Sequence, residues 1–234
     1  MRIISSLMVV LAGCSTSHTD IAATMRFSDR SDAEIARMIG AAGGNDMFGA
    51  EARVNSVADP ITPDPCPAIA ISGNTGTLTG GCTTHDGIEI QGSAIVTNPI
   101  GWTQIDPQYG ADTVYELHQL AFAQSGYTQS FDGSFRITDS FSTYDANLTA
   151  TQLGMSVRSQ LYYHCDAGNS TCNLEGSGVE LIGIGGAQVS GTFYVNNSGT
   201  ADFTLVGADT LTAHVAQGCV SWQISGSGRA KTCP

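Results

Sequence analysis

The sequence predicts an all-β protein, in which a curved antiparallel meander sheet or half-open barrel carries one short N-terminal helix and is cross-linked by local disulfides. Three observations favour this class. Apolar and polar residues alternate over many short segments after Cys66, turn clusters separate these segments, and the chain has 28 glycines but only 13% charged residues. Alternation with a period of two is typical of half-buried strands, and this composition favours strands and turns over helices.

A short apolar run opens the chain. Residues 3–10 are largely apolar and follow a single basic residue, Arg2. A run of roughly 10 residues is too short to span a bilayer as a helix, but it matches the apolar region of an export signal. We therefore expect residues 1–13 to be a signal peptide.

The residues that end this run, Leu11-Ala12-Gly13-Cys14, resemble the lipobox of bacterial lipoproteins. The resemblance implies that the signal is cut before Cys14 and that Cys14 is lipidated, so that two or more acyl chains hold the protein stably on a membrane. Ser15 follows the cysteine, and in this family the absence of Asp there favours the outer membrane, with the domain facing the periplasm or the cell surface. An ordinary signal peptide with a chance cysteine, or an uncleaved anchor, is the alternative.

Between the lipobox and the first predicted helix the sequence is polar. We expect residues 14–30 to be the lipidated cysteine and a flexible tether that holds the domain off the membrane. Ser31 and Glu34 then form a capping-box pattern, apolar residues share one helical face up to Ala42, and Gly43-Gly44 provides a stop. A short helix over 31–44, a linker over 45–65 and an antiparallel β domain over 66–234 complete the predicted organisation.

One glycine-containing unit recurs within the predicted strands. Its frame is an apolar residue, any residue, Gly, and Ser or Thr, and its copies span residues 90–93, 131–134, 174–177, 189–192 and 224–227. Glycine inside a strand usually marks a bulge, a sharp bend or a close approach of backbones. The unit predicts a strongly curved sheet, although a chain rich in Gly, Ser and Thr also produces such units by chance.

Seven cysteines are present, and six remain once Cys14 is assigned to lipidation. An even number in an oxidising compartment indicates disulfides. The six fall into sequence-local pairs that flank predicted turns, so we expect Cys66–Cys82, Cys165–Cys172 and Cys219–Cys233. A metal site built from His164, Cys165 and Cys172 is the alternative, but the spacing departs from the usual paired cysteines of zinc sites, and no metal is expected.

The predicted strand over 114–122 has apolar residues on both faces. Val114, Leu120 and Phe122 are expected on one face, opposite Tyr115, Leu117 and Ala121. A curved sheet can enclose one apolar ligand. Val114, Leu117, Leu120 and Phe122 are therefore the candidate apolar ligand face, and burial under the helix is the simpler explanation of the same pattern.

Charge and motifs exclude several function classes. The formal net charge is −12 and Lys231 is the only lysine, so no basic patch is available for nucleic acid. No hydrolase, zinc-protease or nucleotide-binding motif occurs, and we expect neither enzymatic activity nor a cofactor. A Ser, His and Asp triad assembled in space stays open, because triads are defined by geometry and not by sequence order.

Three functions fit these expectations. The first is a structural or interaction module of the cell envelope, which requires a filled sheet interior and an exposed face for a partner. The second is a carrier or sensor of an apolar ligand such as a lipid, and the third is an envelope hydrolase. The domain after Cys66 resembles uncharacterised envelope lipoproteins, a likeness that implies no particular chemistry.

Overall fold

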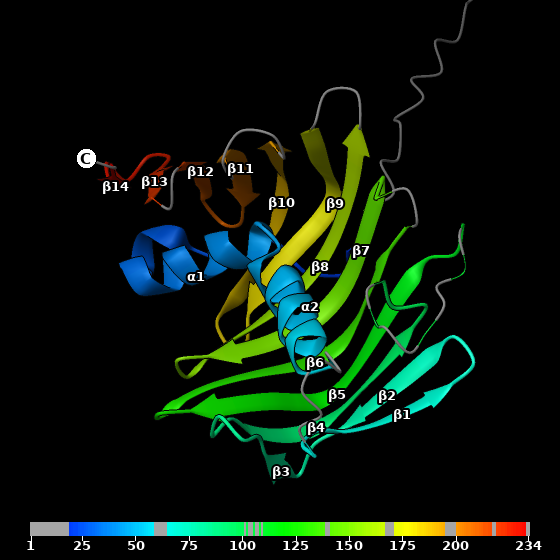
Figure 1. The fold of residues 1–234 in the computed structure, drawn as a ribbon. Helices are drawn as coiled ribbons and strands as arrows, with labels where there is room; N and C mark the ends of the chain where they lie inside the picture. Colours follow the sequence, from blue (N-terminus) through cyan, green and yellow to red (C-terminus); the bar gives the residue numbers. More distant parts are fainter. Residues whose placement is uncertain are drawn as a thin grey trace, which may run out of the picture.

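The structure is a computed structural model that describes residues 19–58, 65–100, 102, 105, 108, 110–138, 141–166, 171–194, 200–216 and 219–232. One antiparallel sheet of 14 strands dominates it, in the order β1-β2-β4-β5-β6-β7-β8-β9-β10-β11-β12-β13-β14, with β3 paired to β4 beside β2. Nearly every strand pairs with its neighbour in the sequence, and the two ends of the sheet do not meet (Figure 1). The predicted all-β fold, a curved and open antiparallel meander, is confirmed.

The strands are β1 Ala68–Ser72, β2 Thr75–Thr79, β3 Cys82–Thr83, β4 Glu89–Thr97, β5 Thr113–Gln124, β6 Tyr127–Ile137, β7 Thr143–Gln152, β8 Met155–Asp166, β9 Thr171–Leu181, β10 Gly185–Tyr194, β11 Thr200–Val206, β12 Thr210–Ala216, β13 Cys219–Ile224 and β14 Ala230–Lys231. Along most of them buried residues alternate with exposed ones. The buried residues face the concave side of the sheet, and the exposed ones form its convex outer face.

Two helices lie against the concave side (Figure 1). Helix α1, Asp32–Ala42, packs on β8 and β9, and helix α2, Asn45–Ala58, packs on β6 and β7. The capping box predicted for α1 is present, because the Ser31 hydroxyl accepts from the Glu34 N–H while the Glu34 carboxylate accepts from the Ser31 N–H. Helix α2 corrects the prediction of a linker over 45–65, since most of that stretch is helical.

A line of β-bulges crosses the sheet at the positions of the recurring glycine unit. The strand registers shift between Gln91 and Ser93, between Leu117 and Leu120, between Gln160 and Tyr163, and between Val189 and Gly191. Four of the five predicted units lie at these bulges or directly beside one, and the fifth, 224–227, forms the turn after β13. Because bulges bend a strand and increase its twist, this line of bulges curves the sheet around the helices.

Close backbone contacts require glycine at two positions in this line of bulges. A Cβ atom on Gly92 would lie 2.2 Å from the Gln119 carbonyl oxygen, and one on Gly133 would lie 2.2 Å from the Asn147 carbonyl oxygen. Both glycines also have positive φ, 74° and 125°. Any side chain at these positions would push neighbouring strands apart.

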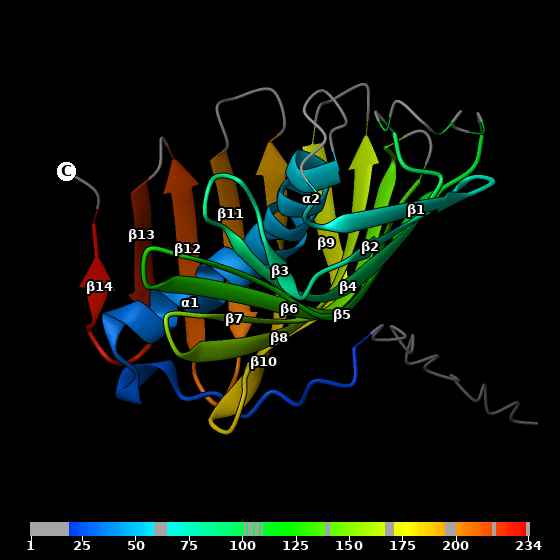
Figure 2. The same cartoon turned by 60° about the horizontal axis from the view of Figure 1, so that its bottom comes forward.

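Residues 19–30, called the N-terminal segment below, are packed on the sheet. Ile21, Met25 and Phe27 are 3%, 1% and 0% exposed, and the main chain of Ala23 forms a parallel bridge with Gly186. Figure 2 shows the segment as the blue trace running along the underside of the sheet to α1. The predicted flexible tether over 14–30 is therefore wrong for residues 19–30, and Cys14 lies outside the described residues.

Three glycines distant in the sequence form the groove that holds this segment. A Cβ on Gly178 would lie 2.7 Å from Thr19 Oγ1, one on Gly186 would lie 2.4 Å from Ile21 Cγ2, and one on Gly207 would lie 2.1 Å from the Met25 carbonyl oxygen. Gly178 and Gly186 belong to the outer face, because their register partners Gln160 and Glu180 point outward. The segment thus begins on the outer face and crosses the edge of the sheet to reach α1.

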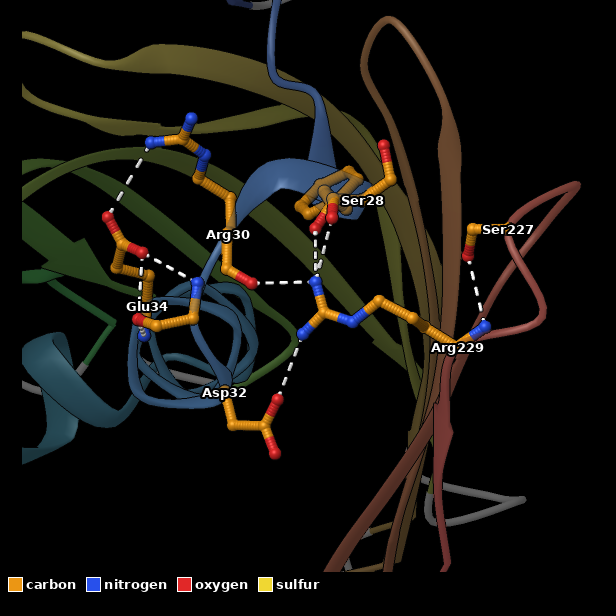
Figure 3. Close-up of polar contacts among 8 residues, drawn as sticks. Ser28, Arg30, Asp32, Glu34, Ser227 and Arg229 are labelled. Atoms are coloured by element: carbon orange, nitrogen blue, oxygen red, sulfur yellow. Dashed lines mark hydrogen bonds and ion pairs between the residues drawn. The ribbon is translucent and has the colours of Figure 1, made fainter.

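Arg229, in the turn before β14, holds the end of the N-terminal segment (Figure 3). Its Nη1 donates to the carbonyl oxygens of Ser28 at 2.9 Å and Arg30 at 2.7 Å, and its Nη2 pairs with Asp32 Oδ1 at 3.0 Å. The guanidinium carbon also lies 5.6 Å from the ring centroid of Trp222. One side chain therefore joins the C-terminal hairpin to the start of α1.

Candidate functional site on the outer face

The predicted ligand face on β5 is part of the hydrophobic core. Leu117, Leu120 and Phe122 are 1%, 0% and 4% exposed, and they belong to one cluster with the buried residues of α1 and α2. Val114 is partly buried on the opposite face of β5. The four residues therefore do not share a face, and the three that are buried pack with the helices.

A bulge explains why the predicted faces of β5 were wrong. The register with β6 shifts between Leu117 and Leu120, and Gln119 has a positive φ of 48°. The Asp132 carboxylate stabilises the extra residue by accepting from the Gln119 N–H at 2.9 Å. The inserted residue shifts the alternation by one, so that Leu120 and Phe122 point to the same side as Leu117.

Polar side chains fix both helices on the concave side. Arg37 of α1 pairs with Asp46 of α2 at 2.8 Å, and its Nη2 donates to the Ala150 carbonyl oxygen of β7 at 3.1 Å. Tyr163 donates to the Ala42 carbonyl oxygen at 2.7 Å, at the end of α1. Burial raises the pKa of Tyr163 and of Asp46, as expected for polar groups enclosed by the core.

Asn55 of α2 connects the helix by hydrogen bonds to Tyr115 of β5 and to Trp102. Its Oδ1 accepts from Tyr115 Oη at 3.2 Å and from Trp102 Nε1 at 3.1 Å. Burial raises the pKa of Tyr115 to about 12, although the bond to Asn55 acts in the opposite direction. Burial also raises the pKa of Glu51, one turn earlier on α2, and sequence patterns gave no indication of this half-buried carboxylate.

The disulfides form between local partners. Cys66 is bonded to Cys82, and Cys165 is bonded to Cys172, its register partner across β8 and β9. The last two sulfurs are therefore not available as thiolate ligands for a metal. Cys219 is also disulfide-bonded, and Cys233, its predicted partner, lies outside the described residues.

The outer face brings together a histidine, a carboxylate and a serine. Asp202 of β11 lies directly opposite His214 of β12, which lies directly opposite Ser221 of β13. His214 Nδ1 is 2.7 Å from Asp202 Oδ1. These residues line a pocket of about 380 Å³ together with Thr212, Gln223 and the β14 edge.

Asp202 and His214 supply the carboxylate and imidazole of a catalytic triad. In a triad the serine hydroxyl bonds to the imidazole, but Ser221 makes a different hydrogen bond. When Nδ1–H donates to Asp202, the Nε2 atom of His214 is left as an acceptor. The Ser221 hydroxyl instead donates to the His214 main-chain carbonyl oxygen at 3.3 Å. The side chains of Asp202 and His214 are 57% and 53% exposed, so water reaches the pair freely.

The same row continues across the sheet toward β7. Thr192 lies opposite Asp202, and it donates to Asn173 Oδ1 at 2.9 Å. His164 is opposite Asn173, and Thr143 is opposite His164. Side chains able to form hydrogen bonds therefore occupy one line over seven neighbouring strands. We call the line from Thr143 to Ser221 the polar row.

The other two histidines among the described residues do not join the row. His118 is exposed on β5 opposite Ser93, His85 lies in the turn before β4, and His18 is outside the described residues. Within the described ranges, no group of three or more His, Cys, Asp or Glu side chains is placed to hold a metal ion.

Comparison with protein-family models, with curated protein sequences and with solved structures finds no match. Among the helices that the structure describes, none has both the length and the apolar character needed to cross a membrane.

Proposed function

We propose that the protein is a lipid-anchored component of the cell envelope that acts as an interaction module, binding a partner protein on the outer face of its sheet. The observation that carries this proposal is the occupied concave side. One continuous cluster of buried side chains joins both helices to the sheet from β2 to β13. A partner therefore meets the convex face, which the exposed side chains of the strands form.

The polar row supports the outer face as the contact surface. Its side chains include hydroxyl, amide, imidazole and carboxylate groups, which give directional hydrogen bonds without a large net charge. A solvent-exposed, hydrogen-bonding surface of this kind suits a protein partner better than a buried small molecule, because small-molecule sites enclose the ligand and are mostly apolar.

A carrier of an apolar ligand receives less support. Such a function needs a space beside Leu117, Leu120 and Phe122, but core side chains and helices surround these residues. Hydrogen bonds from Arg37 and Tyr163 hold α1 in place, so the interior opens only if buried polar groups lose their partners.

Site-specific photo-crosslinking tests the interaction module in its native envelope. A photoreactive residue at Thr212, exposed on β12 beside the polar row, should give one discrete cross-linked product. The same residue at Ser56, exposed on α2, should give none. Equal products from both positions, or none from Thr212, would contradict the proposal.

The anchor is tested separately by metabolic labelling with palmitate. Label should enter the wild-type chain and be lost in Cys14→Ser. A chain that still carries Met1 would contradict a lipidated Cys14. Native mass spectrometry of the envelope-extracted protein tests the carrier: a bound lipid beyond the N-terminal modification would favour the carrier over the interaction module.

A hydrolase is a second candidate, favoured by the Asp202–His214 pair and the neighbouring Ser221. Reaction would require the Ser221 hydroxyl to rotate from its main-chain acceptor toward His214 Nε2. A fluorophosphonate probe should then label the wild-type protein but neither Ser221→Ala nor His214→Gln. Absence of labelling in the wild type would count against this candidate.

A further inference from the structure

Exposed apolar side chains gather at one edge of the sheet. Seven large apolar residues of the described chain are exposed, and four of them, Leu153, Ile182, Ile184 and Val206, lie at hairpin tips. The tips join β7 to β8, β9 to β10 and β11 to β12, so antiparallel pairing places all three at the same end of the strands. We call these four residues the apolar rim.

Leu153 occupies a position that normally excludes such a residue. It is 73% exposed and has a φ of 50° in a two-residue turn with Gly154. Two-residue hairpin turns with positive φ favour Asn, Asp or Gly at this place, because a bulky side chain is strained there. A strained, exposed leucine lowers stability and solubility.

The rim is uncharged in a strongly acidic protein. Stretches 152–155, 181–185 and 205–208 contain no charged residue, while the whole chain has a net charge of −12. Asp209, which follows the third stretch, uses both carboxylate oxygens to accept from the Phe27 and Ser28 N–H groups, and Glu180 directly precedes the second stretch. The tips themselves therefore add no charge that anionic headgroups would repel.

The N-terminal segment runs beside the same tips. Met25 N–H donates to the Gly186 carbonyl oxygen at 2.7 Å, and Ala208 N–H donates to the Met25 carbonyl oxygen at 2.7 Å. These contacts lie next to the β9–β10 and β11–β12 tips. The segment starts further along the outer face, where Thr19 Oγ1 donates to Gln160 at 2.6 Å and Asp20 pairs with Arg158 at 2.9 Å.

Chain length then limits the position of the anchor. Only four residues, 15–18, separate Cys14 from Thr19. Five residue steps reach at most about 18 Å when fully extended. The strand rise gives a similar distance, about 17 Å, from Gln160 along β8 to Met155 beside the Leu153 tip. A lipid on Cys14 therefore lies within about 18 Å of Thr19, a reach that allows it to meet the level of the rim.

We propose that the apolar rim is a membrane-contacting edge, in which the tips carrying Leu153, Ile182, Ile184 and Val206 enter the lipid interface while the lipidated N-terminus holds the sheet against it. Aliphatic side chains gain by burial at the boundary of headgroups and acyl chains. The inference rests on the proposed anchor at Cys14. The sequence alone predicts a domain that a tether holds away from the membrane. In this proposal the sheet has a defined orientation, with the apolar rim at the bilayer and the opposite edge facing away from it.

Tryptophan fluorescence on lipid-attached protein tests the orientation. The chain starting at Cys14 is coupled to a maleimide-functionalised phospholipid through that thiol, with the disulfides intact, and bound to vesicles of brominated phosphatidylcholine. Single variants Leu153→Trp and Ile184→Trp place a probe on two separate tips. The native residues Trp102 and Trp222 are both 5% exposed, and their signal is subtracted using the unsubstituted protein.

Phe141→Trp is the matched control. Phe141 is 50% exposed, has a φ of 53° and lies between β6 and β7, at the opposite end of the strands. The proposal expects the added tryptophan to be quenched at least twofold more in Leu153→Trp and in Ile184→Trp than in Phe141→Trp, with a blue-shifted emission. All three sites are exposed, so each variant should unfold at the wild-type urea concentration.

Two outcomes would overturn the proposal. The first is equal quenching at all three positions. The second is quenching no greater than in the unsubstituted protein, although flotation shows that the protein is bound to the vesicles. In the second case the rim faces away from the lipid and is free for a protein contact instead. Chemical attachment makes this outcome independent of cellular lipidation. Absence of palmitate label from the wild-type chain in cells would contradict the proposed anchor, whereas the quenching pattern tests the rim.

Discussion

The N-terminal segment and strand β1 show opposite relations between regular structure and burial. Residues 19–30 contain only a short 3-10 turn, Phe27–Asp29, yet Met25 and Phe27 are almost completely buried. Strand β1 is a regular edge strand, but four of its five residues are exposed, including Ile69 at 39%. A segment is thus buried when it has a complementary surface to pack against. A regular backbone alone does not bury its side chains.

The difference lies in what each region packs against. The N-terminal segment enters a groove where Gly178, Gly186 and Gly207 leave room for its backbone. Asp209 and Arg229 then bind its main-chain N–H and carbonyl groups. Strand β1 pairs only with β2 and has no described element on its other side. The predictions below test whether the irregular segment indeed contributes more stability than the regular strand.

The largest effect is expected from Phe27→Ala. Removal of a fully buried aromatic side chain leaves a cavity, and the free energy of unfolding should fall by about 3–5 kcal/mol. Urea denaturation measures this loss. Phe141→Ala is the control, because Phe141 is half exposed and should change stability by about 0.5 kcal/mol or less. Similar losses in both variants would show that the segment is not part of the core.

Gly186→Ala should displace the segment at a cost of about 1–3 kcal/mol, because the new Cβ would lie 2.4 Å from Ile21 Cγ2 and 2.7 Å from the Ala22 carbonyl oxygen. Trypsin cleavage after Arg26 should become faster. In the control Gly49→Ala the nearest atom, Gln129 Nε2, is 3.7 Å away, and alanine favours the helix. An unchanged cleavage rate in Gly186→Ala would mean that the groove does not hold the segment.

Asp209→Asn should lower stability by about 1–2 kcal/mol near neutral pH, since charge-assisted bonds to Phe27 and Ser28 are lost. Partial burial acts to raise the pKa of Asp209, but the bonds from the Ser28 and Phe27 N–H groups outweigh it and lower this pKa. The carboxylate therefore stabilises the fold above the unfolded pKa of about 4, and this contribution disappears as pH falls through the lowered value.

Thermal unfolding of wild type and Asp209→Asn at pH 6 and at pH 2.5 checks the sign. The gap in Tm between the two proteins should narrow at pH 2.5. A gap that is the same at both pH values would show that ionised Asp209 does not secure the segment.

The smallest effect is expected from Ile69→Ser on β1. The side chain is exposed, so stability should change by about 0.5 kcal/mol or less in urea denaturation. A loss above about 1 kcal/mol would indicate that the exposed side of β1 is covered in solution, and a concentration dependence of the midpoint would then identify a second copy as the cover.

Local sequence signals predicted what depends on local contacts. The capping box of α1, the strand alternation and the Cys66–Cys82 pair each involve residues near one another in the chain. The signal for α2 was also present, because Met47, Ala50, Val54 and Ala58 repeat at helical spacing and are buried, but Gly43-Gly44 was interpreted as the end of the helical region.

Features that depend on distant residues could not be predicted in this way. The groove for residues 19–30 is defined by glycines more than 150 positions later, so the segment alone looks like a polar tether. The alternation of β5 was misassigned because nothing within the strand marks the bulge at Gln119, which depends on Asp132 of β6. The row of Asp202, His214 and Ser221 is likewise created by strand pairing.

The contacts of Arg229 also determine the order in which the protein can fold. This side chain binds carbonyl groups 199 to 202 positions earlier, so these bonds form only after nearly the whole chain is present. Contacts of such long sequence separation are slow to form. Residues 19–30 are synthesised long before Arg229 and are thus secured late, and shortening the C-terminus before Arg229 should leave residues 19–30 open to proteases even where the other hairpins have folded.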